Sequence, residues 1–167
     1  MVLIDNNFRF LCLYSIMPRI YFAGPLFCQA ECEYNVKVCS LIRKEGFDVF
    51  LPQEQPTVDE LFCGTGRNLN DIMMEVFQRD VAEINKCDAL LFLMDGRVPD
   101  EGACFELGYA YAKGKKCFAL KTDVRTSEDG ADNAMLVSSL NGNIAKDLQS
   151  LLKMLRTFLL QRKNYEI

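Results

Sequence analysis

Histidine and tryptophan are both absent from the 167 residues. Without histidine, neither a Ser-His-Asp nor a Cys-His nucleophile system can form, and zinc sites that use imidazole are excluded. Acid–base chemistry would have to come from carboxylates, tyrosine, lysine or cysteine. The chain also has no excess of positive charge, since 19 Lys and Arg stand against 23 Asp and Glu. This balance argues against a nucleic-acid partner, which needs clustered positive charge.

Long hydrophobic runs and paired cysteines are also missing. No apolar run approaches the roughly 18–20 residues that span a bilayer, so we expect no membrane partner. The short apolar run before Pro18 lacks the basic start and the small-residue cleavage site of a signal peptide, and we expect a cytoplasmic protein. None of the eight cysteines belongs to a Cys-x-x-Cys pair, which argues against a zinc ribbon. Most stand in apolar runs, which favours reduced, buried cysteines.

The regular pattern begins only after Pro18. We expect residues 1–17 to form a disordered or loosely packed N-terminal extension and residues 18–167 to form a single domain. Short β-type runs then alternate with segments of helical spacing. The expected strands are 19–23, 47–51, 88–94 and 116–120; the expected helices are 29–44, 68–86, 100–113, 133–140 and one from 143 or 144 to 161, and residues 53–67 are expected to form a long loop.

The run Asp88–Met94 is almost entirely apolar, which is typical of a strand covered on both faces in a parallel sheet. Together with the alternation of strands and helices, it predicts an α/β three-layer sandwich with a flavodoxin-like parallel sheet of four or five strands. Sites in such folds lie beyond the carboxyl ends of the strands. The loop after the first strand, 23–27, matches neither a dinucleotide-binding nor a Walker motif, so common NAD, ATP and GTP sites are not expected.

Acidic residues gather after the third expected strand, where four fall within twelve residues: Asp95, Asp100, Glu101 and Glu106. Asp100 can cap the following helix, and Glu101 suits the helix dipole. Glu106 lies beyond the first turn among apolar neighbours, where a simple solvated charge is not expected. Gly102 and Gly108 each cost about 1 kcal/mol relative to alanine inside a helix. That cost indicates close approach of a ligand or of another helix.

Two further residues have alternative interpretations. Asp80 is either a surface residue paired with a nearby Lys or Arg, or part of a site. Tyr21 is either a core residue or a site residue that acts through its hydroxyl. Convergent carboxylates without histidine suit glycosyl transfer, in which one attacks the anomeric carbon and a second moves protons at the leaving group. They would equally suit Mg²⁺ held by oxygen ligands, and composition alone does not decide.

Taken together, five segments resemble the nucleoside 2-deoxyribosyltransferase family, and the resemblance covers nearly the whole chain from Arg19. The segments are Ile20–Phe27, Phe50–Glu54, Asp80 with Asp88–Leu90, Asp100–Ala110 and Asp132–Met135. The resemblance implies an enzyme that cleaves the N-glycosidic bond of a 2′-deoxynucleoside and passes the deoxyribosyl group to another free nucleobase. It also implies a covalent deoxyribosyl-enzyme ester, retention of configuration, and no metal or organic cofactor.

The resemblance assigns roles by position. Glu106 would be the nucleophile, and Tyr21 would orient its carboxylate. Asp80 would exchange a proton with the base, whereas Asp100 would bind sugar hydroxyls and assist the acid–base step. The implied substrate-binding residues are Phe27 near the base, Gln53 at the base or sugar, Gly24, Gly102, Asn133 and Met135. Asn133, together with Met135, would come from a neighbouring subunit, so the resemblance implies a homo-oligomer.

Two other functions stay open. One is an N-glycoside hydrolase that acts on a deoxynucleoside or its 5′-monophosphate. In the related hydrolases of 5′-monophosphates, the first loop carries Ser and Arg, which hold the phosphate. The corresponding loop here, Gly24–Gln29, has neither residue. The other is a non-catalytic nucleotide-binding module, which would keep its function if Glu106 were replaced by alanine. The loop 56–67 sets base preference in the family, so the sequence leaves purine or pyrimidine open.

Overall fold

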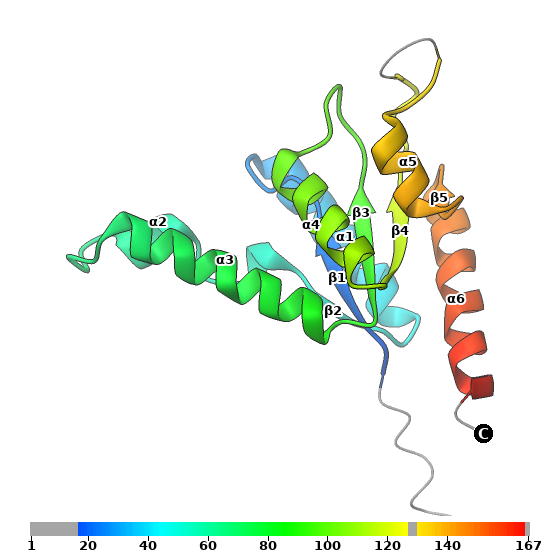
Figure 1. Ribbon diagram of the computed structural model, residues 1–167, viewed down its shortest axis with the longest axis horizontal. Coiled ribbons are helices and arrows are strands. Elements are labelled where there is room, and N and C mark those ends of the chain that lie inside the picture. The colour runs from blue at the N-terminus through cyan, green and yellow to red at the C-terminus, as the bar shows by residue number, and fades with distance from the viewer. Residues whose placement is uncertain (1–16, 127–129, 166–167) are drawn as a thin grey trace, which may run out of the picture.

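A computed structural model describes residues 17–126 and 130–165. Its strands form one parallel sheet in the order β2-β1-β3-β4-β5 (Figure 1). This is the flavodoxin-like strand order, and it confirms the predicted fold class. The strands are β1 (Arg19–Ala23), β2 (Asp48–Phe50), β3 (Ala89–Leu93), β4 (Lys116–Leu120) and β5 (Ile144–Ala145).

Helices cover both faces of the sheet. They are α1 (Gln29–Lys44), the 3₁₀ helix η2 (Pro52–Glu54), α2 (Val58–Phe62), α3 (Leu69–Lys86), α4 (Glu101–Ala112), α5 (Ala134–Leu140) and α6 (Leu148–Tyr165). Helices α1 and α6 pack on one face, and α3, α4 and α5 pack on the other. All five residues of β3 are buried, because this strand has neighbours on both edges and helices on both faces. That environment explains its continuous apolar sequence.

Two expectations about elements were wrong. The last helix begins at Leu148 instead of 143 or 144, because Ile144 and Ala145 pair with β4 as a short fifth strand. A strand of two residues is too short to leave an alternating pattern in the sequence. The expected long loop contains α2, whose start is fixed by a capping box between Thr57 and Glu60. The Thr-x-x-Glu spacing was the available signal for this helix.

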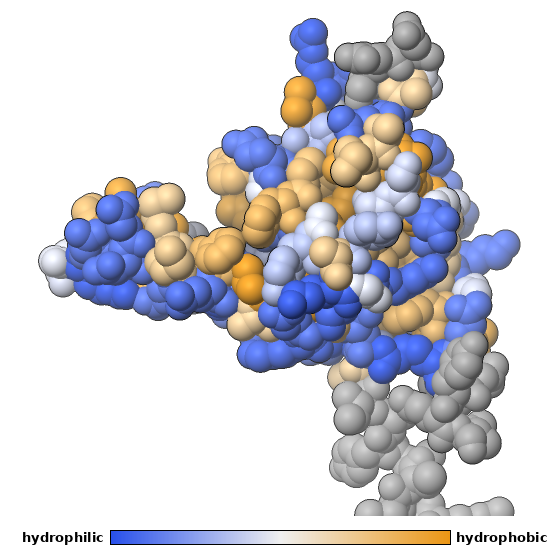
Figure 2. Space-filling view, in the orientation of Figure 1, coloured by the Kyte–Doolittle hydropathy of each residue, from blue (hydrophilic) through white to orange (hydrophobic). Residues whose placement is uncertain are grey.

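Helix α2 and the N-terminal part of α3, residues 58–77, project from the sheet as an arm (Figure 1). Several large apolar side chains on it are exposed, including Met73 and Phe77. Phe77 contacts Phe105 of α4, with ring centroids 5.9 Å apart, and apolar surface runs from the arm onto the body (Figure 2). The arm therefore extends away from the sheet and touches α4 where Phe77 meets Phe105.

The cysteines only partly follow the expectation of burial. All seven that the structure describes are free thiols, and Cys39, Cys87 and Cys117 are buried in the core. Burial raises the pKa of Cys39 to about 12, which keeps that thiol protonated and unreactive. Cys28 and Cys63 are exposed instead, because both lie at helix ends outside the packed faces. Apolar sequence neighbours do not guarantee burial where the chain leaves the sheet.

Residues 1–16 of the expected extension lie outside the described residues. Within the described part of the chain, no helix combines the length and the apolar character needed to cross a membrane.

Candidate active site

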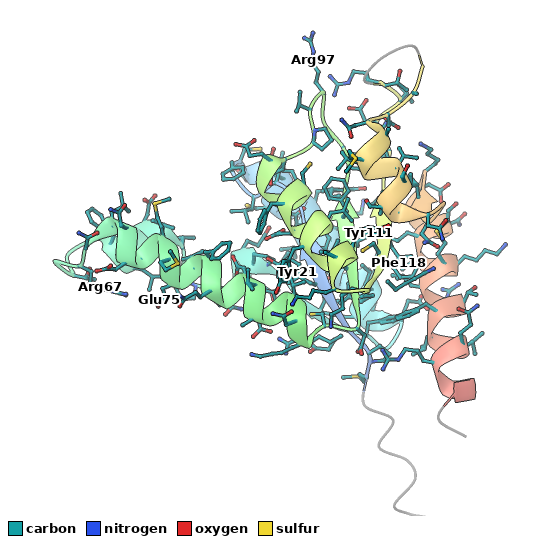
Figure 3. The ribbon with its side chains drawn as sticks, viewed as in Figure 1. Tyr21, Arg67, Glu75, Arg97, Tyr111 and Phe118 are labelled. Carbon is teal, nitrogen blue, oxygen red and sulfur yellow. The ribbon has the colours of Figure 1, made fainter. Side chains whose placement is uncertain are left out.

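The hydroxyl of Tyr21 meets the carboxylate of Glu106 across the sheet–helix boundary. Tyr21 lies on β1 and is fully buried, and its Oη donates a hydrogen bond to Oε1 of Glu106 at 2.5 Å. The Tyr21 ring stacks on Phe50 of β2, with centroids 5.4 Å apart. Figure 3 shows Tyr21 in the centre of the molecule, beneath α4. Tyr21 is therefore a core residue that also binds the half-buried carboxylate of Glu106, so both sequence interpretations of Tyr21 apply.

The environment of Glu106 disfavours negative charge. Burial raises the pKa of this carboxyl to about 8; the hydrogen bond from Tyr21 opposes the rise, and the charges of Asp80 and Asp100 add to it. Burial, followed by the charge of Glu106, raises the pKa of Tyr21 well above its usual range. The phenol therefore stays protonated and continues to donate its hydrogen bond.

This environment gives a prediction about folding stability. The pKa of Glu106 is higher in the folded than in the unfolded chain, so its stabilising contribution is complete below about pH 4.5 and is lost as pH rises through about 8. Glu106→Gln removes the buried charge and keeps an oxygen for Tyr21. We expect this variant to be more stable than the parent well above pH 8 by up to about 5 kcal/mol, and equally stable near pH 4.

Thermal unfolding at several pH values checks this expectation, because about 5 kcal/mol corresponds to a Tm difference of roughly 10–20 °C. Glu101→Gln is the matched control, since Glu101 is an exposed residue of the same helix. A Glu106→Gln variant that is no more stable than its parent at pH 9 would contradict the assigned environment.

Asp80 lies on α3 with Arg79 beside it. Arg79 Nε donates to Asp80 Oδ1 at 3.0 Å, and Arg79 Nη1 donates to the carbonyl oxygen of Pro56 at 3.0 Å. The Asp80 side chain is only 19% exposed. Burial raises its pKa above the ordinary value, and Arg79 opposes that rise. Asp80 is thus paired with an arginine, as expected if it were a surface residue. The pair is nevertheless partly buried and lies close enough to Glu106 to influence its pKa.

Asp100 caps α4. Its Oδ2 accepts a hydrogen bond from the backbone N–H of Ala103 at 2.7 Å, as the sequence predicted for this residue. A Cβ at Gly102 would lie 3.2 Å from the same oxygen, so the glycine leaves room for the capping carboxylate. Asp100 is close enough to Glu106 to influence its pKa. Three acids and one phenol therefore meet where α4 crosses the end of β1.

A cavity of about 470 Å³, here named the arm pocket, opens beside Asp80. Its size is within the range of small-molecule sites. The lining comes from the β1–α1 loop, the segment after β2 and α3: Leu26, Phe27, Pro52, Gln53, Gln55, Pro56, Thr57, Val58, Asp59, Val76, Arg79 and Asp80. Phe27 is 79% exposed. The side chain of Gln53 is fixed by hydrogen bonds to α1. The Gln53 amide donates to the carbonyl oxygen of Cys32 and accepts from Asn35.

Other predicted site residues lie elsewhere. A Cβ at Gly24 would be 2.9 Å from Cβ of Leu93, so this glycine is required by packing between neighbouring strands. Asn133 caps α5 by accepting from the N–H of Met135 at 3.0 Å. Met135 lines a separate cavity of about 560 Å³ between α4 and α5, the α4–α5 groove. The chain does not bring Asn133 and Met135 into its own arm pocket.

Two expectations about sequence features need correction. Beyond its chain neighbours and the backbone of its own helix, no atom of the described residues lies within 4 Å of a Cβ built at Gly108, so close approach of another described helix does not explain that glycine. Asp95 does not join the acid cluster; its carboxylate accepts from the N–H groups of Thr122 and Asp123 and joins the loops after β3 and β4. Sequence reasoning also missed Arg79, whose only signal was its position next to Asp80.

The backbone N–H groups that precede α1 are already hydrogen-bonded to a side chain of the same chain. Glu31 Oε2 accepts hydrogen bonds from the N–H of Phe27 at 2.9 Å and of Cys28 at 3.0 Å. Helix starts after a parallel strand are common phosphate sites, because free N–H groups and the helix dipole attract anions. Here a carboxylate already takes that position. Among residues 17–126 and 130–165, no group of three or more cysteine or acidic side chains is arranged to hold a metal ion.

The model of the nucleoside 2-deoxyribosyltransferase family matches residues 20–140. This range contains β1, α3, α4 and every residue of the acid cluster. The chain belongs to the nucleoside 2-deoxyribosyltransferase family. The family consists of enzymes, and its small-molecule substrates are nucleosides and nucleobases.

Three other proteins are similar to this chain in sequence or in structure. An uncharacterized protein of Ureaplasma parvum is 31% identical to this chain over 145 residues. The match covers 78% of this chain and 85% of that protein. A conserved protein from Enterococcus faecalis has a similar structure, with a TM-score of 0.67, 28% identity, and coverage of 82% and 96%. A 2-deoxyribosyltransferase from Bacillus psychrosaccharolyticus shares the fold, with a TM-score of 0.65, 24% identity, and coverage of 80% and 90%.

Proposed function

We propose that this protein is a nucleoside 2-deoxyribosyltransferase that works through a covalent ester on Glu106. The observation that carries the proposal is the 2.5 Å hydrogen bond from Tyr21 Oη to Glu106 Oε1. It fixes one oxygen of a poorly solvated carboxylate and leaves Oε2 for attack on C1′ of the sugar. Because burial disfavours charge on Glu106, conversion of the anion into a neutral ester is favoured.

The proposed reaction has two displacement steps at C1′. In the first, a bond forms between Glu106 Oε2 and C1′, the bond from C1′ to the base nitrogen breaks, and its electron pair stays on the base. Asp80 supplies the proton that the leaving base takes up. In the second half, Asp80 takes a proton from the incoming base while that base displaces Glu106 from C1′. Two inversions give net retention, as in retaining glycosidases.

The remaining acid cluster suits a 2′-deoxy sugar. Asp100 is held at the start of α4 by its bond to Ala103, and we assign it to the sugar hydroxyls and to assistance in proton transfer. A 2′-deoxy sugar lacks the electron-withdrawing hydroxyl that opposes positive charge at C1′, so a few carboxylates suffice. The Glu31 carboxylate on the amides of Phe27 and Cys28 favours a nucleoside over its 5′-monophosphate, since two anions would repel there.

We also propose that the active unit is a homo-oligomer. Asn133 and Met135 lie on the α4–α5 side of their own chain. There they are available to a second subunit, in which they would complete the sugar end of the site. Met135 is 80% exposed, which suits a side chain that is covered by a partner.

Base exchange is the experiment that tests the proposed reaction. The protein is incubated with a 2′-deoxynucleoside, with and without a second free base, and products are separated by chromatography. We expect exchange at least about tenfold faster than release of free deoxyribose, because the ester is poised to react with a base. The 5′-monophosphate of the same nucleoside should react much more slowly. Sugar release that is independent of added base would instead identify a hydrolase, and binding without either reaction would identify a non-catalytic module.

A further inference from the structure

Arg79 is a cation in the arm pocket that the proposed reaction does not use. Its Nε is bonded to Asp80 Oδ1 and its Nη1 to the Pro56 carbonyl oxygen, both at 3.0 Å. These two bonds join α3 to the segment after β2 and fix the plane of the guanidinium. The side chain is 25% exposed and lines the cavity. Arg79 is therefore held rigidly at a surface that a ligand would contact.

The guanidinium keeps unused donors. It carries five N–H groups, and two of them have the partners given above. Within the described residues Nη2 has no acceptor. Among the residues that the structure describes, Asp80 is the one side-chain partner of Arg79, and one Asp80 oxygen is taken by that bond. Three N–H groups of the guanidinium therefore have no partner among the described residues, and an occupant with oxygen acceptors would satisfy them.

The geometry points to Arg79 as a specificity residue that donates hydrogen bonds to the carbonyl oxygen at C6 of a purine base or at C4 of a pyrimidine base. The substrate class is then the oxo bases, such as hypoxanthine, guanine, uracil and thymine, in preference to the amino bases adenine and cytosine. This inference rests on the proposed function, because it concerns the base in the same pocket. An amino group would turn its own N–H donors toward those of Arg79 and leave the cation without an acceptor.

The same contact assists the departure of the base. As the bond from C1′ to nitrogen breaks, the ring gains negative charge, and a carbonyl oxygen carries part of it. A fixed cation next to that oxygen interacts more strongly with the transition state than with the bound substrate. Arg79 is suited to this because its charge is permanent and its planar donors are already oriented.

Matched substrate pairs test the inference. We expect the native protein to prefer 2′-deoxyinosine over 2′-deoxyadenosine, or 2′-deoxyuridine over 2′-deoxycytidine, by about 10- to 100-fold in kcat/KM. Arg79→Gln should bring that ratio close to one, by lowering the value for the oxo member more than that for the amino member. Loss of the bond to Asp80 should slow both members alike, so it cancels in the ratio. Arg79→Lys keeps the charge without the planar donors and should retain part of the preference. The ratio within one variant is independent of how much of that protein is folded.

Arg67→Gln is the matched control. Arg67 is paired with Glu75 at the far end of the arm, away from Tyr21 (Figure 3), so its loss should leave the preference unchanged. Equal use of both members by the native protein, or an equal fall for both in Arg79→Gln, would overturn the role of Arg79 and leave the proposed transferase intact. Failure of the native protein to exchange the base of any of the four nucleosides would instead remove the proposed function, and this inference with it.

Discussion

Replacing Glu106 with glutamine should abolish deoxyribosyl transfer, with kcat lowered by about 10⁴-fold or more. The amide keeps the size of the side chain and an acceptor for the Tyr21 hydroxyl, but it cannot form the ester. Because the buried charge is also removed, the loss of activity should accompany an unchanged or higher Tm. Initial rates of base exchange, measured together with thermal unfolding, separate a chemical defect from a folding defect.

Mass spectrometry of the reaction intermediate completes this test. A brief mix of the native protein with a 2′-deoxynucleoside, followed by acid quenching and digestion, should add one deoxyribosyl unit to the peptide that contains Glu106. Glu101→Gln changes the same charge on an exposed residue of α4 and should form the adduct normally. Normal exchange by Glu106→Gln, or an adduct on another residue, would show that Glu106 is not the nucleophile.

Two inactive variants should restore activity when they are mixed. If Asn133 completes the site of a neighbouring subunit, Asn133→Ser should be inactive alone, as should Glu106→Gln. A mixed oligomer joins the intact Glu106 of one variant to the intact Asn133 of the other. Random exchange of subunits within dimeric units should then give about a quarter of the native activity. Activity is measured before and after the mixture is equilibrated under conditions that allow exchange of subunits.

Serine is the appropriate replacement because it still caps a helix, so α5 should keep its start. Ser139→Ala, on the same helix, is a control that should remain active alone. A fully active monomer in light scattering, or a mixture that stays inactive although mixed oligomers form, would show that each chain completes its own site. Either result would leave the assignment of Glu106 untouched.

Much of this site could be anticipated from local sequence. Glu106 stands out because a carboxylate among apolar residues in the second turn of a helix needs an explanation that a solvated surface position does not. Asp100 is likewise marked by its place before a helix. Asp95 was grouped with them on equal grounds, yet it ties together the loops after β3 and β4. Proximity in sequence could not separate a structural carboxylate from a site carboxylate.

The sequence by itself determined the class of fold, because burial on both faces makes β3 continuously apolar and helical segments alternate with the strands. The tertiary structure alone decided which groups meet. Tyr21 reaches Glu106, 85 residues later, because β1 and β3 are neighbours in the sheet and α4, which follows β3, packs back over β1. Arg79 gained its importance in the same way, from the cavity beside α3. Hydrophobic periodicity reports how a segment is buried, whereas strand order and register fix which distant side chains share one pocket.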